Sequence, residues 1–445
     1  ITNSTYDGLI YHVDEVKDQL AKSNIPHLHF DEAWYPYAHF HPIYNGRYAM
    51  SEYHKEYHPT VYSTQSTHKL LAAFSQSSMI HIKDGLQPLN CDVFNETFMM
   101  HTSTSPQYNI IASLDVATKM MEGQLGYRLI SEAISEAIAF RQEFHKVKNS
   151  FDTHKEWFFD LWQPEAVLKI KKSGTQHFMN LAEDSAKLWY LNAEDTWHGF
   201  SEISENFTML DPIKVTLLTP GINHDTTFQE MGIPAPIVSK YLMKKGVVDE
   251  KTSFYSMLFL FSIGVNKSKS MNLLSDLVLF KEVYDANALL LEVFPDLIEK
   301  QVKRYQGVSL KEVCAEMHHF LKRENASKLL MNAFEILPEP VLTPNEAYQH
   351  LIKSHYTEYS LDELEDKVIL TMLAPYPPGI PIVMPGEKIT KESGLIIEYL
   401  KMLERFDNAF PGFENEVHGV EVKIVHGKRR YFVNALLNGL KSSSG

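Results

Sequence analysis

Apolar residues recur at helical spacing in several parts of the chain. This spacing predicts a helix over residues 9–23 and a long helix from Leu114 to about Val147, which Gly123 and Gly126 interrupt. A proline near the start and a glycine just past the end predict another helix over residues 234–245. Further helices are predicted at residues 270–285, 310–323, 343–353 and 390–403.

Short apolar runs bounded by turn residues predict strands. One such run ends at Asp31, and Val61–Ser63 predicts a second strand before another apolar stretch, Leu70–Ile82. Residues 157–162, 214–218 and 257–261 predict the strands of a small sheet. The proline-rich segment 375–381 excludes a helix or a central strand and predicts a rigid turn. No period of 20–50 residues repeats, so the chain is not a solenoid.

Composition and charge limit the classes of protein that fit. The chain has 445 residues, 44% of them hydrophobic, which is long enough for two or three globular domains. Its formal charge is −14, from 42 basic and 56 acidic residues. An acidic chain without a basic run argues against nucleic acid or an anionic membrane as a partner. No run approaches ~18 apolar residues, so no membrane span is predicted.

The cysteines and histidines of the chain suggest neither a disulfide framework nor a metal site. Cys91 and Cys314 form neither a disulfide framework nor a metal motif, and with no signal peptide pattern they favour a cytoplasmic location. Four histidines fall in one loop at spacings that fit no common metal site: His39, His41, His54 and His58. We therefore predict no metal. Two further interpretations concern loops, an inserted loop over residues 165–193 and a flexible tail over 442–445.

The segment Ser66-Thr67-His68-Lys69 carries the first candidate chemistry. A lysine followed by apolar residues tends to lose its proton, and a neutral amine can attack an aldehyde. The hydroxyl groups of Ser66 and Thr67 can donate to a phosphate. The alternative is a surface lysine after a turn rich in serine and threonine, which is the commoner meaning of such a string by itself.

Asp31 is the second candidate, because it ends the predicted strand before the lysine segment. An acid at the carboxyl end of a strand in an α/β sheet faces the ligand crevice. In an enzyme that uses pyridoxal 5'-phosphate (PLP), such an acid keeps the pyridine nitrogen protonated. The alternative is an aspartate that caps the next turn. Together, Asp31 and Lys69 resemble the large domain of fold-type I PLP enzymes.

Several long strings, in order, make the resemblance specific. The chain resembles the bacterial lysine/arginine/ornithine decarboxylases from its first residues to about Gly419. The strings that carry the resemblance are His29-Phe30-Asp31-Glu32-Ala33-Trp34, Phe40-His41-Pro42-Ile43-Tyr44, residues 64–76, residues 99–106 and Pro375-Tyr376-Pro377-Pro378-Gly379.

The resemblance implies a fold and a domain organisation. The fold class is α/β: the C-terminal half of a fold-type I (aminotransferase-like) large domain, followed by an α+β and helical C-terminal domain. The expected domains are residues 1–122, the partial PLP-binding domain; 123–265, a connecting helix and small α+β subdomain; and 266–445, mostly helical. Against the family, the receiver-like N-terminal domain, a linker and the first half of the large domain are absent, so we expect a fragment or one piece of a processed protein.

The resemblance also implies roles for the residues around the lysine. Lys69 is the expected Schiff-base lysine, Asp31 pairs with the pyridinium, and His68 lies beside the cofactor and orients the phosphate or the carboxylate. Ala33 and Trp34 are carried over as cofactor-binding positions, and Ser66 as a phosphate contact. The expected cofactor is therefore pyridoxal 5'-phosphate.

Two expected contacts lie further along the chain. The hydroxyl-rich loop with Ser103 and Ser105 is placed by the family against the cofactor phosphate of a neighbouring subunit. The expected partners are therefore a second copy, as a homodimer or a larger homo-oligomer of dimers, and the absent N-terminal half. Glu250 aligns with the family acid that points toward the distal cationic group of the substrate. Asp249 competes for this role, and a solvated loop acid is the alternative.

The expected substrate is a small basic amino acid. Different strings lean toward the lysine, arginine and ornithine branches, and we take lysine to cadaverine, with arginine to agmatine and ornithine to putrescine as alternatives. An aminotransferase on the same fold fits the C-terminal strings less well. An alternative of another class is an inactive fragment that binds a partner subunit.

Overall fold

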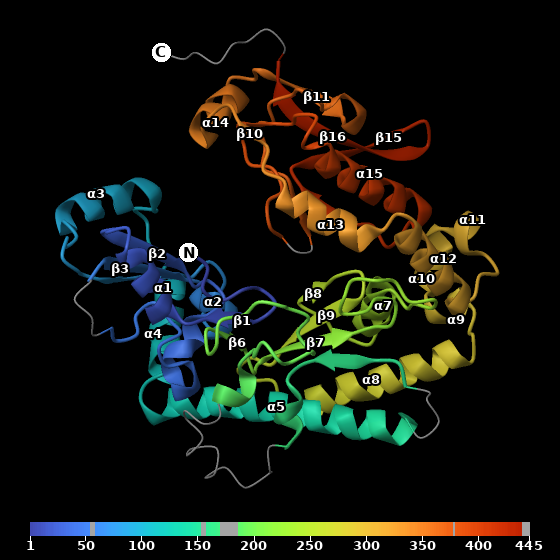
Figure 1. Cartoon of the computed structure of the whole chain (residues 1–445), viewed down its shortest axis with the longest axis horizontal. Coiled ribbons are helices and arrows are strands. Elements are labelled where there is room, and N and C mark those ends of the chain that lie inside the picture. The colour runs from blue at the N-terminus through green and yellow to red at the C-terminus, as the bar shows by residue number, and fades with distance from the viewer. Residues whose placement is uncertain (54–57, 153–156, 170–185, 377–378, 438–445) are drawn as a thin grey trace. The chain divides into compact units, whose positions relative to one another are not determined.

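The chain folds into two compact units. The computed structural model describes residues 1–53, 58–152, 157–169, 186–376 and 379–437 (Figure 1). The first unit comprises residues 1–217 and 258–275, and the second comprises residues 218–257 and 276–445. The three-domain division expected from sequence places its boundaries elsewhere and stays a prediction. The expected flexible tail and most of the expected inserted loop lie outside the described residues.

A three-stranded sheet in the first unit carries the segments of interest. Strand β2 (His27–Asp31) pairs in parallel with β3 (Thr60–Gln65), and β4 (Met79–Lys83) pairs antiparallel with β3, in the order β2-β3-β4 (Figure 1). Helix α1 (Val13–Ala21) precedes β2 and the short helix α2 (Thr67–Leu70) follows β3. Strands β2 and β3 were predicted from their short apolar runs.

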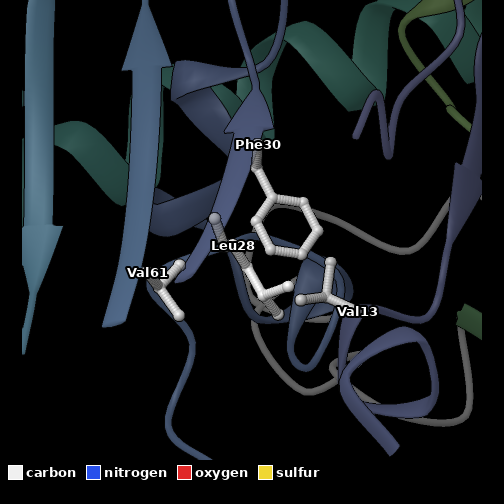
Figure 2. Packing of buried hydrophobic residues seen from close by; sticks show 5 residues of the cluster. Val13, Leu28, Phe30 and Val61 are labelled. Atoms are coloured by element: carbon white, nitrogen blue, oxygen red, sulfur yellow. The ribbon is translucent and has the colours of Figure 1, made fainter. Parts of the chain in front are cut away.

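The sheet and α1 share a hydrophobic core. Val13 of α1 points toward Leu28 and Phe30 of β2, with Val61 of β3 beside them (Figure 2). All of these side chains are at most 3% exposed. Leu28 and Phe30 alternate with exposed neighbours along β2, which is the pattern of a strand with one buried face. This packing fixes the direction in which the carboxyl end of β2 points.

The start of the chain differs from the prediction. The predicted helix over residues 9–23 begins only at Val13, because Leu9–Tyr11 form strand β1, which pairs antiparallel with β6 (Thr208–Leu210). Ile10 is fully buried in this pair. Its apolar spacing fits a helix as well as a strand, and the distant partner strand decides between them.

Helices α3 (Cys91–His101), α4 (Tyr108–Met120) and α5 (Gln124–Asp152) follow the sheet. The long helix predicted from Leu114 is two helices, because the chain turns between α4 and α5 at Gly123, which has φ +60°. Phe140 of α5 packs against Phe261, with ring centroids 5.2 Å apart. Strands β5 (Asp160–Trp162), β7 (Lys214–Leu218) and β9 (Ser256–Leu260) pair in the order β5-β7-β9, and β5 is shorter than predicted.

The second unit mixes helices with small sheets. Its helices include α7 (Ala235–Lys244), α12 (Leu310–Arg323), α13 (Ala326–Glu335), α14 (Pro344–Ile352) and α15 (Gly394–Ala409). Shorter helices are α9 (Leu290–Val293), α10 (Pro295–Lys300) and α11 (Val302–Tyr305), and α8 (Lys267–Asp285) contributes its later part. Capping boxes at Ser309 and Thr343 begin α12 and α14.

The strands near the end of the chain were not predicted. Strands β11 (Tyr356–Ser360), β16 (Lys428–Leu436) and β15 (Val420–Val425) form an antiparallel sheet in the order β11-β16-β15. Two short pairs accompany it: β10 (Glu339–Pro340) with β13 (Glu387–Lys388), and β12 (Ala374–Tyr376) with β14 (Glu416–His418). β8 (Lys251–Thr252) also belongs to the second unit. Among the described helices, none is long and apolar enough to cross a membrane.

Candidate active site

Asp31 and the lysine segment lie at the same edge of the sheet. Asp31 is the last residue of β2 and lies opposite Thr64 on the parallel strand β3. β3 ends one residue later, and Ser66 then precedes α2, which contains Lys69. Because parallel strands end at one edge, this topology brings the predicted acid and the predicted lysine to the same rim. This rim is where open α/β sheets bind ligands.

The Asp31 carboxyl group is exposed but makes a local contact. Its Oδ1 accepts a hydrogen bond of 3.0 Å from the backbone N–H of Ala33. The turn-capping alternative considered from sequence is thus present. A carboxylate can accept several hydrogen bonds, so this turn bond is compatible with a second contact at the exposed side of the group. The turn also fixes the position of Ala33 relative to the Asp31 carboxyl group.

Lys69 lies against an aromatic face. Its Nζ is 4.6 Å from the centroid of the Trp34 ring. Trp34 is held in turn by an edge contact with Tyr6, with ring centroids 5.3 Å apart. The side chain of Lys69 is half-buried rather than extended into solvent. This packing argues against the alternative of an ordinary surface lysine.

His68 and Ser66 flank the lysine differently. Nδ1 of His68 donates to the carbonyl oxygen of Ser77 over 2.6 Å, which fixes the ring and leaves Nε2 as an acceptor when the ring is neutral. Ser66 is the N-cap residue of α2, yet its side chain makes no capping hydrogen bond. The hydroxyl group of Ser66 is therefore not committed to the helix start.

The loop around Asp31 and Trp34 is anchored by a buried acid. Both Tyr37 and Tyr44 donate to the carboxyl group of Asp211, the latter over 3.0 Å. Burial raises the pKa of Asp211 above its ordinary value, although Lys214 and the two phenols oppose the shift. Arg47, also buried, donates to the carbonyl oxygen of Phe207 over 2.9 Å. These contacts hold residues 37–47 to the two ends of β6.

A pocket of about 720 Å³ adjoins the lysine segment. Gln65 and Thr67 line it at the end of β3, and the loop with Tyr35 and Phe40 lines another side. Further lining comes from β4, from residues 48–50, and from the end of α4 with the turn after it, including Met121. Asp31 and Lys69 do not line this pocket.

The predicted phosphate loop forms a local turn. Ser103 Oγ accepts a hydrogen bond of 3.1 Å from the backbone N–H of Ser105, and both residues are exposed between α3 and α4. The structure therefore places these hydroxyl groups on the surface of the first unit. Their expected contact with a neighbouring subunit stays a prediction.

The predicted substrate contact lies in the second unit. Asp249 accepts from Ser239 Oγ of α7 over 2.5 Å and from Thr252 Oγ1 of β8, so its carboxylate joins these two elements. Glu250, next to it, is half-buried. The role of Glu250 toward a substrate cation stays a prediction.

One acid at the rim was missed from sequence. Glu32 follows Asp31 and is 1% exposed, with four hydrogen-bond donors around its carboxylate. The signal for it was the alternation along β2, which sends Asp31 outward and its neighbour inward.

The residues at the rim fit PLP. An exposed acid at the end of β2 can meet a pyridine nitrogen, and an amine packed on an aromatic ring can meet an aldehyde. Fold and site together define an α/β protein with a lysine–aspartate pair at the carboxyl edge of parallel strands. The chain belongs to the Orn/Lys/Arg decarboxylase family: residues 1–269 match its major domain and residues 327–437 its C-terminal domain. The resemblance drawn from the sequence strings is confirmed.

Its similarity to individual relatives extends over nearly the whole chain. It is 45% identical over 437 residues to the lysine decarboxylase LdcA of Pseudomonas aeruginosa, covering 98% of this chain and 56% of the relative. It is 44% identical to the inducible lysine decarboxylase of Escherichia coli, covering 94% of this chain and 55% of the relative. The solved structure of lysine decarboxylase A from Pseudomonas aeruginosa matches with a TM-score of 0.90, covering 98% of this chain and 57% of that one. The chain thus spans little more than half the length of these relatives.

Proposed function

We propose that this chain carries out the PLP-dependent decarboxylation of a basic amino acid, with lysine converted to cadaverine. The observation that carries the proposal is the parallel pairing of β2 and β3, which puts Asp31 and the Lys69 segment at one rim of the sheet. Membership of the Orn/Lys/Arg decarboxylase family supports the reaction type.

Each rim residue has a role in this proposal. Lys69 holds the cofactor through its amine and exchanges with the amine of the substrate, and Asp31 keeps the ring nitrogen protonated. When bound, PLP withdraws electrons from the bond to the departing carboxylate. Trp34 covers one side of the Lys69 amine and so fixes where the amine lies at the rim. His68, fixed through Ser77, presents Nε2 toward the phosphate or the carboxylate, and the Ser66 hydroxyl donates to the phosphate.

Lysine is the proposed substrate because relatives named for it are more similar than those named for other basic amino acids. The two lysine decarboxylases above are 44–45% identical to this chain. The biodegradative arginine decarboxylase of Escherichia coli is 39% identical, and the inducible ornithine decarboxylase of Lactobacillus is 32% identical. Liquid chromatography with mass detection, on the protein supplied with PLP and equal concentrations of the three amino acids, should find cadaverine as the main product.

The role of Lys69 is tested by trapping. Borohydride reduction of the PLP-loaded protein, followed by peptide mapping, should find a pyridoxyl adduct on Lys69. The matched control is Lys146→Ala, which removes an exposed lysine of α5 that pairs with Glu143 and should leave the adduct unchanged. An adduct on another lysine, with Lys69 unmodified, would refute the assignment.

A fragment that binds a partner subunit without catalysis is the second candidate. The observation that favours it is a set of exposed apolar side chains on α3 and α4, among them Met100 at 80% and Tyr108 at 81%. The visible absorption spectrum discriminates the two. A band above 400 nm that borohydride removes supports the enzyme, and its absence in protein that has folded and been saturated with PLP supports the binding role.

A further inference from the structure

Glu32 is a buried acid next to the exposed Asp31. Successive residues of a strand point to opposite faces, so the outward position of Asp31 at the end of β2 directs the Glu32 side chain inward. Glu32 continues the strand pairing, since its backbone N–H donates to the carbonyl oxygen of Thr64 on β3 over 2.9 Å. Its position behind the rim is therefore fixed by the sheet itself.

Both carboxylate oxygens of Glu32 are used. Oε2 accepts from Ser63 Oγ over 2.6 Å and from Gln65 Nε2 over 3.2 Å, both on β3. Oε1 accepts from the backbone N–H of Ala49 over 2.7 Å and from Asn3 Nδ2 over 3.1 Å. The side chain that directly follows β2 thus binds the end of β3 and two further segments of the first unit.

The set of donors requires a carboxylate. All four groups donate, and a carboxylate accepts at both oxygens and offers no competing hydrogen. An amide in its place would turn an NH2 group toward one pair of donors. Buried donors left without an acceptor are costly, so the segments around the amide would have to move.

The hydrogen bonds of Glu32 join the segments that carry the two residues that act in the proposed reaction. Asp31 directly precedes Glu32, and the Lys69 helix begins just after Gln65. We propose that Glu32 is a positioning residue, whose carboxylate ties the ends of β2 and β3 together and so fixes Asp31 relative to Lys69. This inference rests on the proposed function for its catalytic meaning. It does not require Glu32 to touch substrate or cofactor.

The test is Glu32→Gln in the full PLP-loaded protein. The pH midpoint of the visible cofactor band should shift by roughly half a unit or more, because the acid beside the ring is displaced. The value of kcat should fall roughly 10- to 100-fold with KM little changed, since about 1 Å of misplacement has effects of this size. Amide hydrogen exchange should become faster over residues 60–66.

Two further variants provide a smaller perturbation of the same network and a control outside it. Ser63→Ala removes one of the two donors to Oε2 and should give a smaller change in the same direction, even if Glu32→Gln fails to fold. Asp407→Asn is the matched control, because Asp407 is also buried and accepts from Tyr431 Oη and the Asn415 amide in the second unit. It should lower stability without moving the midpoint of the cofactor band.

The outcomes separate this inference from the proposed function. A wild-type protein with no adduct at Lys69 refutes the proposed function, whereas faster exchange over residues 60–66 in Glu32→Gln still supports the tie between the strands. A wild-type adduct with an unchanged band midpoint and unchanged exchange in both Glu32→Gln and Ser63→Ala overturns the inference and leaves the proposed function intact. An equal shift in Asp407→Asn also overturns it.

Discussion

At the residue scale, adjacent acids take different tasks according to their hydrogen bonds. Asp31 is exposed while Glu32 is fully hydrogen-bonded inside, and the carboxylate of Asp249 accepts from hydroxyl groups of α7 and β8. An acid whose oxygens already accept from neighbouring hydroxyl groups is poorly suited to pair with a substrate cation. This difference makes the two members of each pair separable by mutation.

We predict that Glu250→Gln lowers kcat/KM for lysine by an amount equivalent to roughly 2–5 kcal/mol, as for a broken buried charge pair. Cofactor content should not change, because the residue is not proposed to touch PLP. Steady-state kinetics with lysine provide the measurement, and Asp249→Asn is the matched control. Loss in Asp249→Asn alone would move the role by one residue, and loss in neither would remove this loop from the substrate site.

His41 is the residue for which a pH effect is expected. Its ring stacks on Tyr127 at 5.1 Å and its Nδ1 accepts from the backbone N–H of Ile43 over 3.2 Å. Burial lowers the pKa of His41 to about 4. In the unfolded chain the pKa is about 6.5, so between these values the unfolded state binds more protons.

The sign of the effect follows from that difference. The contribution of neutral His41 is fully present above about pH 6.5 and is lost as the pH falls toward 4, by roughly 3 kcal/mol in total. Melting temperatures of the first unit should therefore drop over this range more steeply in the wild type than in His41→Gln, which does not titrate. Equal slopes in both proteins would contradict the prediction.

At the scale of elements, a close approach of backbone to helix holds the segment before α7. A Cβ atom at Gly232 would lie 2.1 Å from Nδ1 of His318 on α12. That nitrogen is hydrogen-bonded to Tyr255 Oη over 2.7 Å, and His318 Nε2 donates to the carbonyl oxygen of Gln229 over 3.1 Å. The absence of a side chain at Gly232 is what allows these bonds.

We predict that Gly232→Ala destabilises the second unit by roughly 1–3 kcal/mol, the usual cost of overpacking. Chemical denaturation followed by circular dichroism provides the measurement. The matched control is Gly394→Ala at the start of α15, where a Cβ atom meets nothing within 4 Å. A loss in the control equal to that in Gly232→Ala would show that overpacking is not the cause.

The elements also show what sequence can and cannot reveal. Strands β2 and β3 and helix α12 follow from local runs and spacing, and α12 was predicted with its observed bounds. β1 was assigned to a helix because its partner lies far along the chain. β16 was missed although Tyr431, Val433 and Ala435 are buried at alternate positions, a period that could have been recognised.

The candidate site divides in the same way. Asp31 and Lys69 stand in contiguous strings, so sequence alone could single them out. The Glu32 network could not be predicted, because its donors come from residues 3, 49, 63 and 65 and meet only in the folded unit. Strand alternation shows that Glu32 points inward, but not what it binds.

At the scale of the whole molecule, we predict that the active form is at least a dimer. The expected role of Ser103 and Ser105 toward a neighbouring phosphate, together with exposed apolar residues of α3 and α4, supports this. The double variant Ser103→Ala, Ser105→Ala should retain PLP less well, since each charge-assisted hydrogen bond contributes roughly 1.5–3 kcal/mol. Light scattering gives the mass, and equilibrium dialysis gives the PLP affinity.

Mixing variants tests whether the loop acts across subunits. The double serine variant mixed with Lys69→Ala should recover some activity, because one site of the hybrid then has both the lysine and the intact loop. Unmixed Lys69→Ala is the control. Hybrids that form but recover nothing would place the loop within its own subunit.

The pairing of β1 with β6 has a consequence for biosynthesis. Leu9 lies opposite Leu210, so the two strands are about 200 residues apart in the chain. At 5–20 residues per second, a ribosome needs roughly 10–40 s to make the second strand after the first. Strands β2 and β3 are synthesised within a small part of that time. The segment around Ile10 therefore lacks its β6 partner long after the strand that carries Asp31 is complete, and chaperones have this interval in which to bind it.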